Sequence, residues 1–152
     1  MAETVELTTA ADTHEFGRAL GAVLRAGDLV LLAGPLGAGK TALAQGIGAG
    51  LGVQGRVSSP TFIIAREHRP GPRGIPMVHV DAYRLGGSLD ELDDLDLDTT
   101  LVDSALVVEW GEDTATRLTA DHLLIHLTPR PDDTRLATIE RHGTWSNRAL
   151  AP

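Results

Sequence analysis

The sequence contains no cysteine, so neither disulfide bonds nor thiolate metal sites are possible. No apolar run approaches membrane-spanning length, and no basic start leads into an apolar segment near the N-terminus, so we expect a cytoplasmic protein without a membrane partner. The net charge of −8 argues against broad binding of RNA or DNA by this chain alone, because affinity for phosphate backbones depends on Lys and Arg. In a nucleic-acid pathway, such an acidic chain would act through a basic partner.

Lysine and asparagine are almost missing as well. Lys40 is the single lysine among 13 basic residues, and Asn147 is the single asparagine. The guanine-reading signature of GTPases needs an Asn followed by a Lys, which this chain cannot provide. ATP is therefore the favoured nucleotide.

The lone lysine lies in Gly34-Pro35-Leu36-Gly37-Ala38-Gly39-Lys40-Thr41, a full match to the phosphate-loop pattern G-x-x-x-x-G-K-[ST]. Glycines allow a backbone in which successive N–H groups point at phosphate oxygens. The ammonium of Lys40 can follow the β- and γ-phosphates, Thr41 places a hydroxyl on a cation, and a following helix contributes its positive end. We expect the nucleotide to contact residues 35–42, from Pro35, Leu36, Gly37 and Ala38 through Gly39, Lys40, Thr41 and Ala42.

Apolar runs and turn residues outline one domain over residues 1–152, with a tail weakly ordered after about residue 143. The pattern predicts an α/β fold of the P-loop NTPase kind, in which a mixed sheet with a parallel centre and antiparallel margins carries helices on both faces. The expected strands cover residues 4–7, 28–33, 61–65, 77–80, 105–108, 122–127 and 135–140, the third with the fourth and the last two forming hairpins. The expected helices run from an N-cap at Asp12 or Thr13 to about Arg25, and from Lys40 to about Gly52.

Two carboxylates follow apolar strands. Asp81 comes after Met77-Val78-His79-Val80, and Glu109 after Leu106-Val107-Val108. Either fits the second motif of P-loop enzymes, in which a strand delivers a carboxylate that holds Mg²⁺ or its waters. An acid at the solvated end of a strand is the alternative, and sequence alone does not decide which of the two contacts the metal.

Two further patterns have less specific explanations. Arg66, Arg69 and Arg73 could belong to the lid of a small-molecule kinase, although their Gly- and Pro-rich setting favours a solvated turn. His122 and His126 have metal-ligand spacing on a helix, but their apolar surroundings predict a strand, where they would stand roughly 13 Å apart. We therefore expect no zinc site.

Three segments follow the phosphate loop in order, namely Ser58-Ser59-Pro60-Thr61-Phe62, His79-Val80-Asp81-Ala82-Tyr83-Arg84-Leu85 and Val108-Glu109-Trp110. Together with the loop they resemble the TsaE (YjeE) family, the ATPases of bacterial tRNA threonylcarbamoyladenosine biosynthesis. The resemblance is close from about Phe16 to Gly111, and later strands match in pattern and length.

The resemblance implies roles for individual residues. Thr61 would belong to a switch loop near the triphosphate, and Asp81 would contact metal or water. Glu109 with Thr41 would hold Mg²⁺, and Trp110 would lie beside the nucleotide, although a core position suits Trp110 equally well. The implied partners are the transferase TsaD and its companion TsaB, with tRNA reached through the complex. The acidic run between Asp90 and Asp98 could dock such a partner, but a solvated helix face is favoured.

The motifs and the resemblance together predict an ATP- and Mg²⁺-dependent hydrolase in which Lys40, Asp81 and Glu109 act on the γ-phosphate. No arginine is clearly placed to complete the site, so turnover is expected to be slow without a partner. A nucleotide-sensing adaptor that needs no hydrolysis and a small-molecule kinase are the alternatives.

Overall fold

The computed structural model describes residues 2–34, 39–54, 65–81, 103–109, 122–132, 134–143 and 145. These residues form a seven-stranded sheet in the order β1-β7-β6-β2-β5-β4-β3. Its strands are β1 (Ala2–Leu7), β2 (Leu29–Ala33), β3 (Ala65–His68), β4 (Met77–Asp81), β5 (Ala105–Glu109), β6 (His122–Pro129) and β7 (Arg135–His142). The two helices are α1 (Ala10–Val23) and α2 (Lys40–Leu51).

The sheet is parallel at its centre and antiparallel at both margins, as predicted. Strands β6, β2, β5 and β4 run parallel to one another. The hairpins β3–β4 and β6–β7 and the edge strand β1 supply the antiparallel pairs. All five residues of β2 and all five of β5 are buried, which is typical of central parallel strands covered on both faces.

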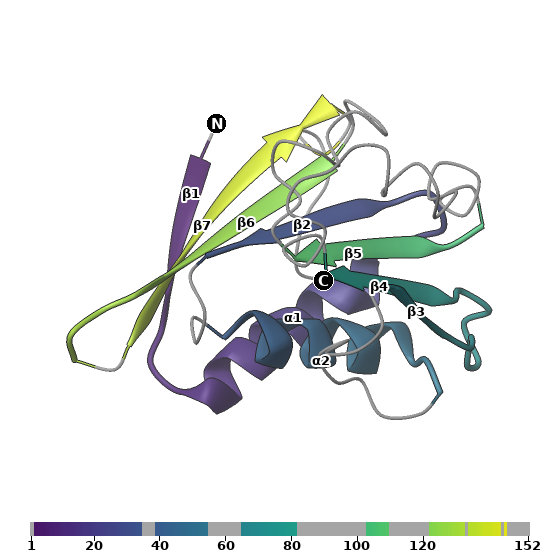
Figure 1. Cartoon of the computed structure of the whole chain (residues 1–152), viewed down its shortest axis with the longest axis horizontal. Coiled ribbons are helices and arrows are strands. Elements are labelled where there is room, and N and C mark those ends of the chain that lie inside the picture. Colours follow the sequence, from purple (N-terminus) through teal and green to yellow (C-terminus); the bar gives the residue numbers. More distant parts are fainter. Residues whose placement is uncertain are drawn as a thin grey trace.

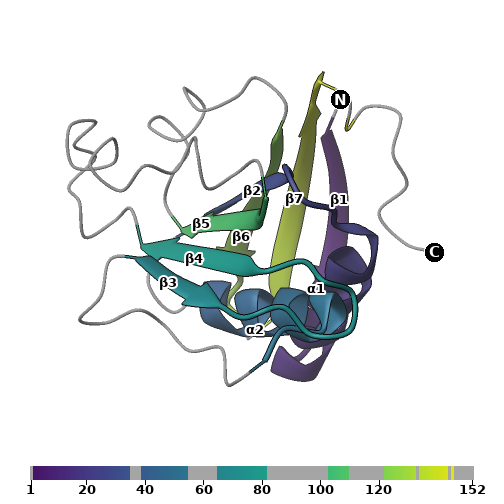
Figure 2. The ribbon, with the colours of Figure 1, turned by 90° about the vertical axis from the view of Figure 1, so that its right-hand side faces the viewer.

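Helices α1 and α2 lie side by side beneath the same face of the sheet (Figures 1 and 2). Val30 and Leu32 of β2 and Val107 of β5 point to this face and pack with Leu43 and Ile47 of α2 in one core. Helices were expected on both faces of the sheet. Helices α1 and α2 cover one face, and the described part of the chain contains no helix on the opposite face.

Glycines let the two helices touch backbone to backbone. A Cβ added at Gly17 or Gly21 of α1 would come within 2.4 Å or 2.2 Å of the carbonyl oxygens of Leu43 and Ile47. On α2, a Cβ at Gly46 or Gly50 would come within 2.1 Å of a carbonyl oxygen of α1. The same residues that weaken a helix in isolation therefore allow this close packing.

The boundaries differ from the prediction most clearly at α1 and β3. The N-cap of α1 is Thr9, not Asp12 or Thr13: Asp12 is instead the third helical residue, and its side chain accepts from the N–H of Thr9 in a capping box. Strand β3 continues to His68, beyond its expected end, whereas the expected beginning at residues 61–64 lies outside the described residues.

The weak order expected after about residue 143 stays a prediction, although one residue of this segment is described. Trp145 is only 1% exposed and belongs to the core beneath the sheet. Residues 144 and 146–152 lie outside the described part.

Arg73 lies in an exposed turn, as expected, and from there its side chain also joins the ends of both helices. Its guanidinium donates to the carbonyl oxygens of Gly21 (2.7 Å) and Leu24 (2.6 Å) at the end of α1 and of Gly50 (3.2 Å) near the end of α2. A cation at the negative ends of two helices interacts favourably with the carbonyl groups of their last turns. These contacts occupy the side chain at the opposite end of α2 from Lys40.

Candidate nucleotide site

Lys40, the first residue of α2, reaches back to the residue that follows β2. Strand β2 ends at Ala33 and α2 begins at Lys40. Lys40 is 6% exposed, and its ammonium donates to the carbonyl oxygen of Gly34 at 2.8 Å. The strand, the turn and the helix thus have the order that the phosphate-loop motif predicts. Pro35, Leu36, Gly37 and Ala38 lie outside the described residues.

The first turn of α2 is built to meet an anion. Its N-cap, Gly39, has φ +102°, in the left-handed region, and no side chain caps the helix. Thr41 and Ala42 follow in this turn and are half-buried. Uncapped N–H groups and the positive end of the helix dipole favour a negatively charged group here.

Asp81 and Glu109 end two neighbouring strands, as predicted. Parallel pairing sets Asp81 of β4 directly beside Glu109 of β5, and Glu109 directly beside Leu32 of β2. Leu32 lies two residues before Gly34, whose carbonyl binds Lys40. Glu109 therefore lies beside the strand that leads into the loop, and Asp81 lies one strand further away. The side chain of Asp81 is outside the described part, whereas that of Glu109 is described and only 6% exposed.

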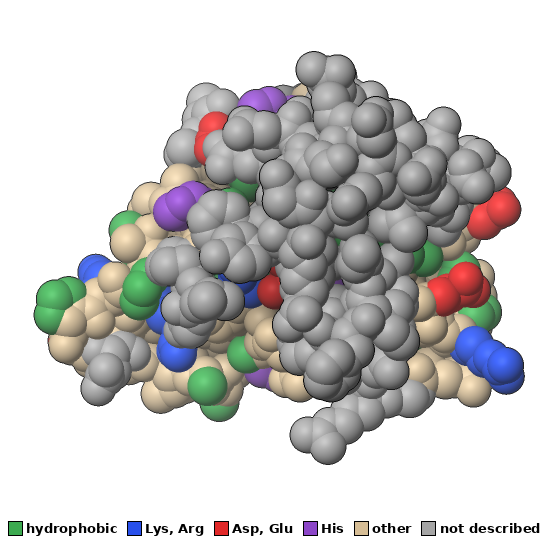
Figure 3. Space-filling view, viewed as in Figure 1, with side chains coloured by type: hydrophobic (Ala, Val, Ile, Leu, Met, Phe, Trp, Pro, Cys, Tyr) green, Lys and Arg blue, Asp and Glu red, His purple; other side chains and the backbone are tan. Residues whose placement is uncertain are grey.

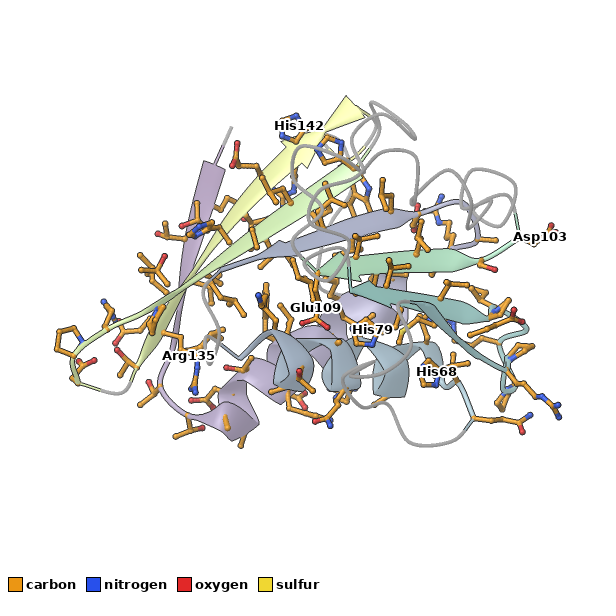
Figure 4. All side chains as sticks on the ribbon, in the orientation of Figure 1. His68, His79, Asp103, Glu109, Arg135 and His142 are labelled. Carbon is orange, nitrogen blue, oxygen red and sulfur yellow. The ribbon has the colours of Figure 1, made fainter. Side chains whose placement is uncertain are left out.

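A histidine that sequence reasoning did not assign to the site contacts Glu109. His79 Nε2 lies 2.6 Å from Glu109 Oε2, and His79 is fully buried. The two side chains point toward each other between the sheet and α2 (Figure 4). An ionised carboxylate can only accept hydrogen bonds, so Nε2 carries the hydrogen and donates it to Glu109. Alternation along β4 was an available signal, because it places His79 on the same face as Asp81.

Glu109 suits a divalent cation. Within the described residues it forms no ion pair with Lys or Arg, and His79 fixes one oxygen. A buried carboxylate held by a histidine, with the Thr41 hydroxyl in the first turn of the neighbouring helix, gives the oxygen donors that Mg²⁺ prefers.

The remaining predicted positions divide into two groups. Thr61 and Trp110 lie outside the described residues, as does the acidic run from Asp90 to Asp98. His122 and His126 are on strand β6, which confirms the strand, and the His122 ring stacks on that of His142 at 4.3 Å between centroids. In the part of the chain that the structure describes, no helix is long and apolar enough to cross a membrane.

A buried strand, a glycine-capped helix with a lysine folded onto the loop, and a carboxylate on the adjacent parallel strand define a P-loop NTPase-like domain. Among solved structures, YdiB of Bacillus subtilis has this fold with a TM-score of 0.79 and 28% identity, covering 95% of this chain and 88% of that one. The family described as threonylcarbamoyl adenosine biosynthesis protein TsaE matches residues 7–137. The chain belongs to the TsaE family.

Curated relatives agree. The TsaE protein of Streptomyces coelicolor is 58% identical over 131 residues, covering 86% of this chain and 87% of the relative. The TsaE protein of Mycobacterium tuberculosis is 52% identical over 142 residues, covering 89% of this chain and 84% of the relative. Bacillus subtilis TsaE is 35% identical over 133 residues, with 87% and 81% covered. The family places the chain in tRNA threonylcarbamoyladenosine biosynthesis.

Proposed function

We propose that this chain binds and hydrolyses ATP with Mg²⁺ as the nucleotide-driven component of tRNA threonylcarbamoyladenosine formation, acting in the cytoplasm with TsaD and TsaB. The observation that carries the proposal is the buried Glu109 carboxylate, set on the strand beside β2 and held by His79. Among the described residues no Lys or Arg pairs with this carboxylate, and a buried carboxylate is costly unless something positive joins it. A nucleotide-bound metal ion would provide that charge.

Each residue of the site has a distinct task in this proposal. Lys40 would leave the Gly34 carbonyl and neutralise charge that develops on the transferred phosphate, while the N–H groups of the α2 first turn bind phosphate oxygens. Thr41 and Glu109 would hold Mg²⁺, and Asp81, beside Glu109 in the sheet, would orient the attacking water or the metal. Bound Mg²⁺ would supply charge neutralisation across the β- and γ-phosphates.

The two carboxylates then have unequal positions. Glu109 lies next to β2 and therefore nearer the loop, whereas Asp81 is one strand further away. This order favours Glu109 as the metal ligand and Asp81 as the residue that acts through water. Thr61 and Trp110 remain predicted nucleotide contacts.

The test is release of phosphate from ATP by the purified chain, alone and with TsaD and TsaB. We expect slow release alone, stimulation by the partners, and loss in both Lys40→Ala and Glu109→Gln. Tight ATP binding with no hydrolysis under any condition would instead support a nucleotide-sensing adaptor. Phosphate transferred to an acceptor molecule, with none set free, would identify a kinase.

A further inference from the structure

Arg135, the first residue of β7, lies against the phosphate loop. Alternation along β7 points Arg135 to the same face of the sheet as Ala137 and Ile139, which belong to the core between the sheet and the helices. A Cβ built on Gly39 would lie 3.0 Å from Arg135 Nε, 3.2 Å from Cδ and 3.7 Å from Cζ. The guanidinium is therefore next to the residue that caps α2.

Nothing in the described part of the chain neutralises this guanidinium. Its Nε atom is buried without a hydrogen-bond partner, and the side chain forms no ion pair with a described residue. The acids of the neighbouring strand and hairpin are engaged elsewhere. Glu6 pairs with Arg130 at 3.0 Å. Asp132 accepts from the hydroxyl (2.5 Å) and the N–H (3.1 Å) of Thr134, and these bonds hold the pKa of Asp132 below its usual value.

The start of α2 thus carries positive charge from more than one source. Lys40, the positive end of the helix and Arg135 come together around Gly39. In the space-filling view, several Lys and Arg side chains lie near the β6–β7 hairpin, at the left-hand end of the molecule (Figure 3). A guanidinium that no acid among the described residues pairs with, set beside the positive end of a helix, indicates a site for an anion.

Strand order shows which part of a nucleotide Arg135 would meet. Strand β2 has β5, with Glu109, on one side and β6 on the other, and β7 lies beyond β6. Arg135 and Glu109 accordingly lie on opposite sides of the start of α2 (Figure 4). A triphosphate whose metal-bearing end lies near Glu109 has its nucleoside end toward Arg135.

We propose that the Arg135 guanidinium binds the nucleotide at the phosphate nearest the nucleoside, the α-phosphate that ATP and ADP share. The inference rests on the proposed nucleotide-binding function and adds a residue that the phosphate-loop motif does not contain. A planar guanidinium suits two oxygens of one phosphate, and its position away from Glu109 separates it from the bond that breaks. Arg135 is thus a binding residue for both nucleotides and not a finger that stabilises the transferred phosphate.

The experiment is titration calorimetry of ADP and ATP with the full chain and with Arg135→Met, which keeps the apolar stem against Gly39. We expect both affinities to fall by the same factor, roughly 10- to 100-fold, as for the loss of a charge-assisted hydrogen bond. The ATP concentration for half-maximal phosphate release should rise in Arg135→Met. Arg130→Ala is the matched control, because Arg130 belongs to the same hairpin but pairs with Glu6, and its nucleotide affinity should be unchanged.

Other outcomes would overturn the proposal. Unchanged affinity in Arg135→Met would mean that the guanidinium does not touch the nucleotide, and a loss confined to ATP would place it at the γ-phosphate. A loss for ADP that is absent for the diphosphates of other bases would place it on adenine. If Arg135→Met fails to fold in a thermal-unfolding control, Arg135→Lys tests the same point, since an ammonium should bind more weakly than the guanidinium. Wild-type protein that binds no nucleotide would refute the proposed function itself.

Discussion

The contact between His79 and Glu109 leads to a prediction in which two similar substitutions have different results. His79 contacts Glu109 through Nε2, which lies 2.6 Å from Glu109 Oε2. The other ring nitrogen, Nδ1, is buried without a partner among the described residues. Glutamine carries its amide nitrogen as many bonds from Cα as Nε2, and asparagine carries it at the position of Nδ1. His79→Gln should therefore keep the donor to Glu109, and His79→Asn should lose it.

The size of the effect follows from burial. His79 is fully buried and Glu109 is 6% exposed, so water cannot readily replace the lost donor. A hydrogen bond to a charged group contributes about 1.5–3 kcal/mol, and losing the residue that orients a metal ligand typically weakens metal binding by about 10- to 100-fold. We expect the Mg²⁺ concentration for half-maximal phosphate release to rise by about that factor in His79→Asn and to stay close to the wild-type value in His79→Gln.

The assay is Mg²⁺ titration of phosphate release at saturating ATP, with Mg²⁺-dependent nucleotide affinity as a second readout. Both variants lose the imidazole ring, so thermal unfolding should show a similar loss of stability in each and provides the control for packing. Equal Mg²⁺ requirements in the two variants would refute the reasoning, because the ring would then only fill space beside Glu109.

Two further predictions concern the helix pair. Gly46→Ala should lower the free energy of unfolding by about 1–3 kcal/mol, because the new Cβ would lie 2.1 Å from the carbonyl oxygen of His14. Helix propensity alone predicts a gain of about 1 kcal/mol. Denaturant unfolding distinguishes the steric loss from the propensity gain, with the exposed Ala49→Gly as the control that reports helix propensity alone. A Gly46→Ala variant more stable than the wild type would show that the helices separate freely. Arg73→Ala should cost about 1–3 kcal/mol through the lost hydrogen bonds to the ends of α1 and α2. Thermal unfolding beside Arg69→Ala checks this, and equal melting temperatures would contradict it.

Features that depend on a few consecutive residues could be predicted. The phosphate loop, the lysine within it and the start of α2 follow from a motif in which each residue type sets the local backbone or supplies a charge. Central strands β2 and β5 are continuous apolar runs, and each hairpin surrounds a turn rich in Pro, Gly or Asp. The acids after two apolar strands, Asp81 and Glu109, were found for the same reason.

Local signals were less successful where several residues compete for one role. Thr9, Asp12 and Thr13 can all cap a helix, and the capping box between Thr9 and Asp12 decides among them. The glycines of α2 predict a weak helix, and their use becomes visible only with α1 packed against them.

What the sequence alone determined is thus the class of site: a phosphate loop, two carboxylates at strand ends and a mixed α/β sheet. The tertiary structure decided which side chains share that site. His79 contacts Glu109, 30 residues away, because β4 and β5 pair in one particular register. Arg135 reaches Gly39 because β7 lies two strands from β2 on the side opposite β5. Strand order and register come from the burial of all the apolar faces together, a property that no single segment of the sequence contains.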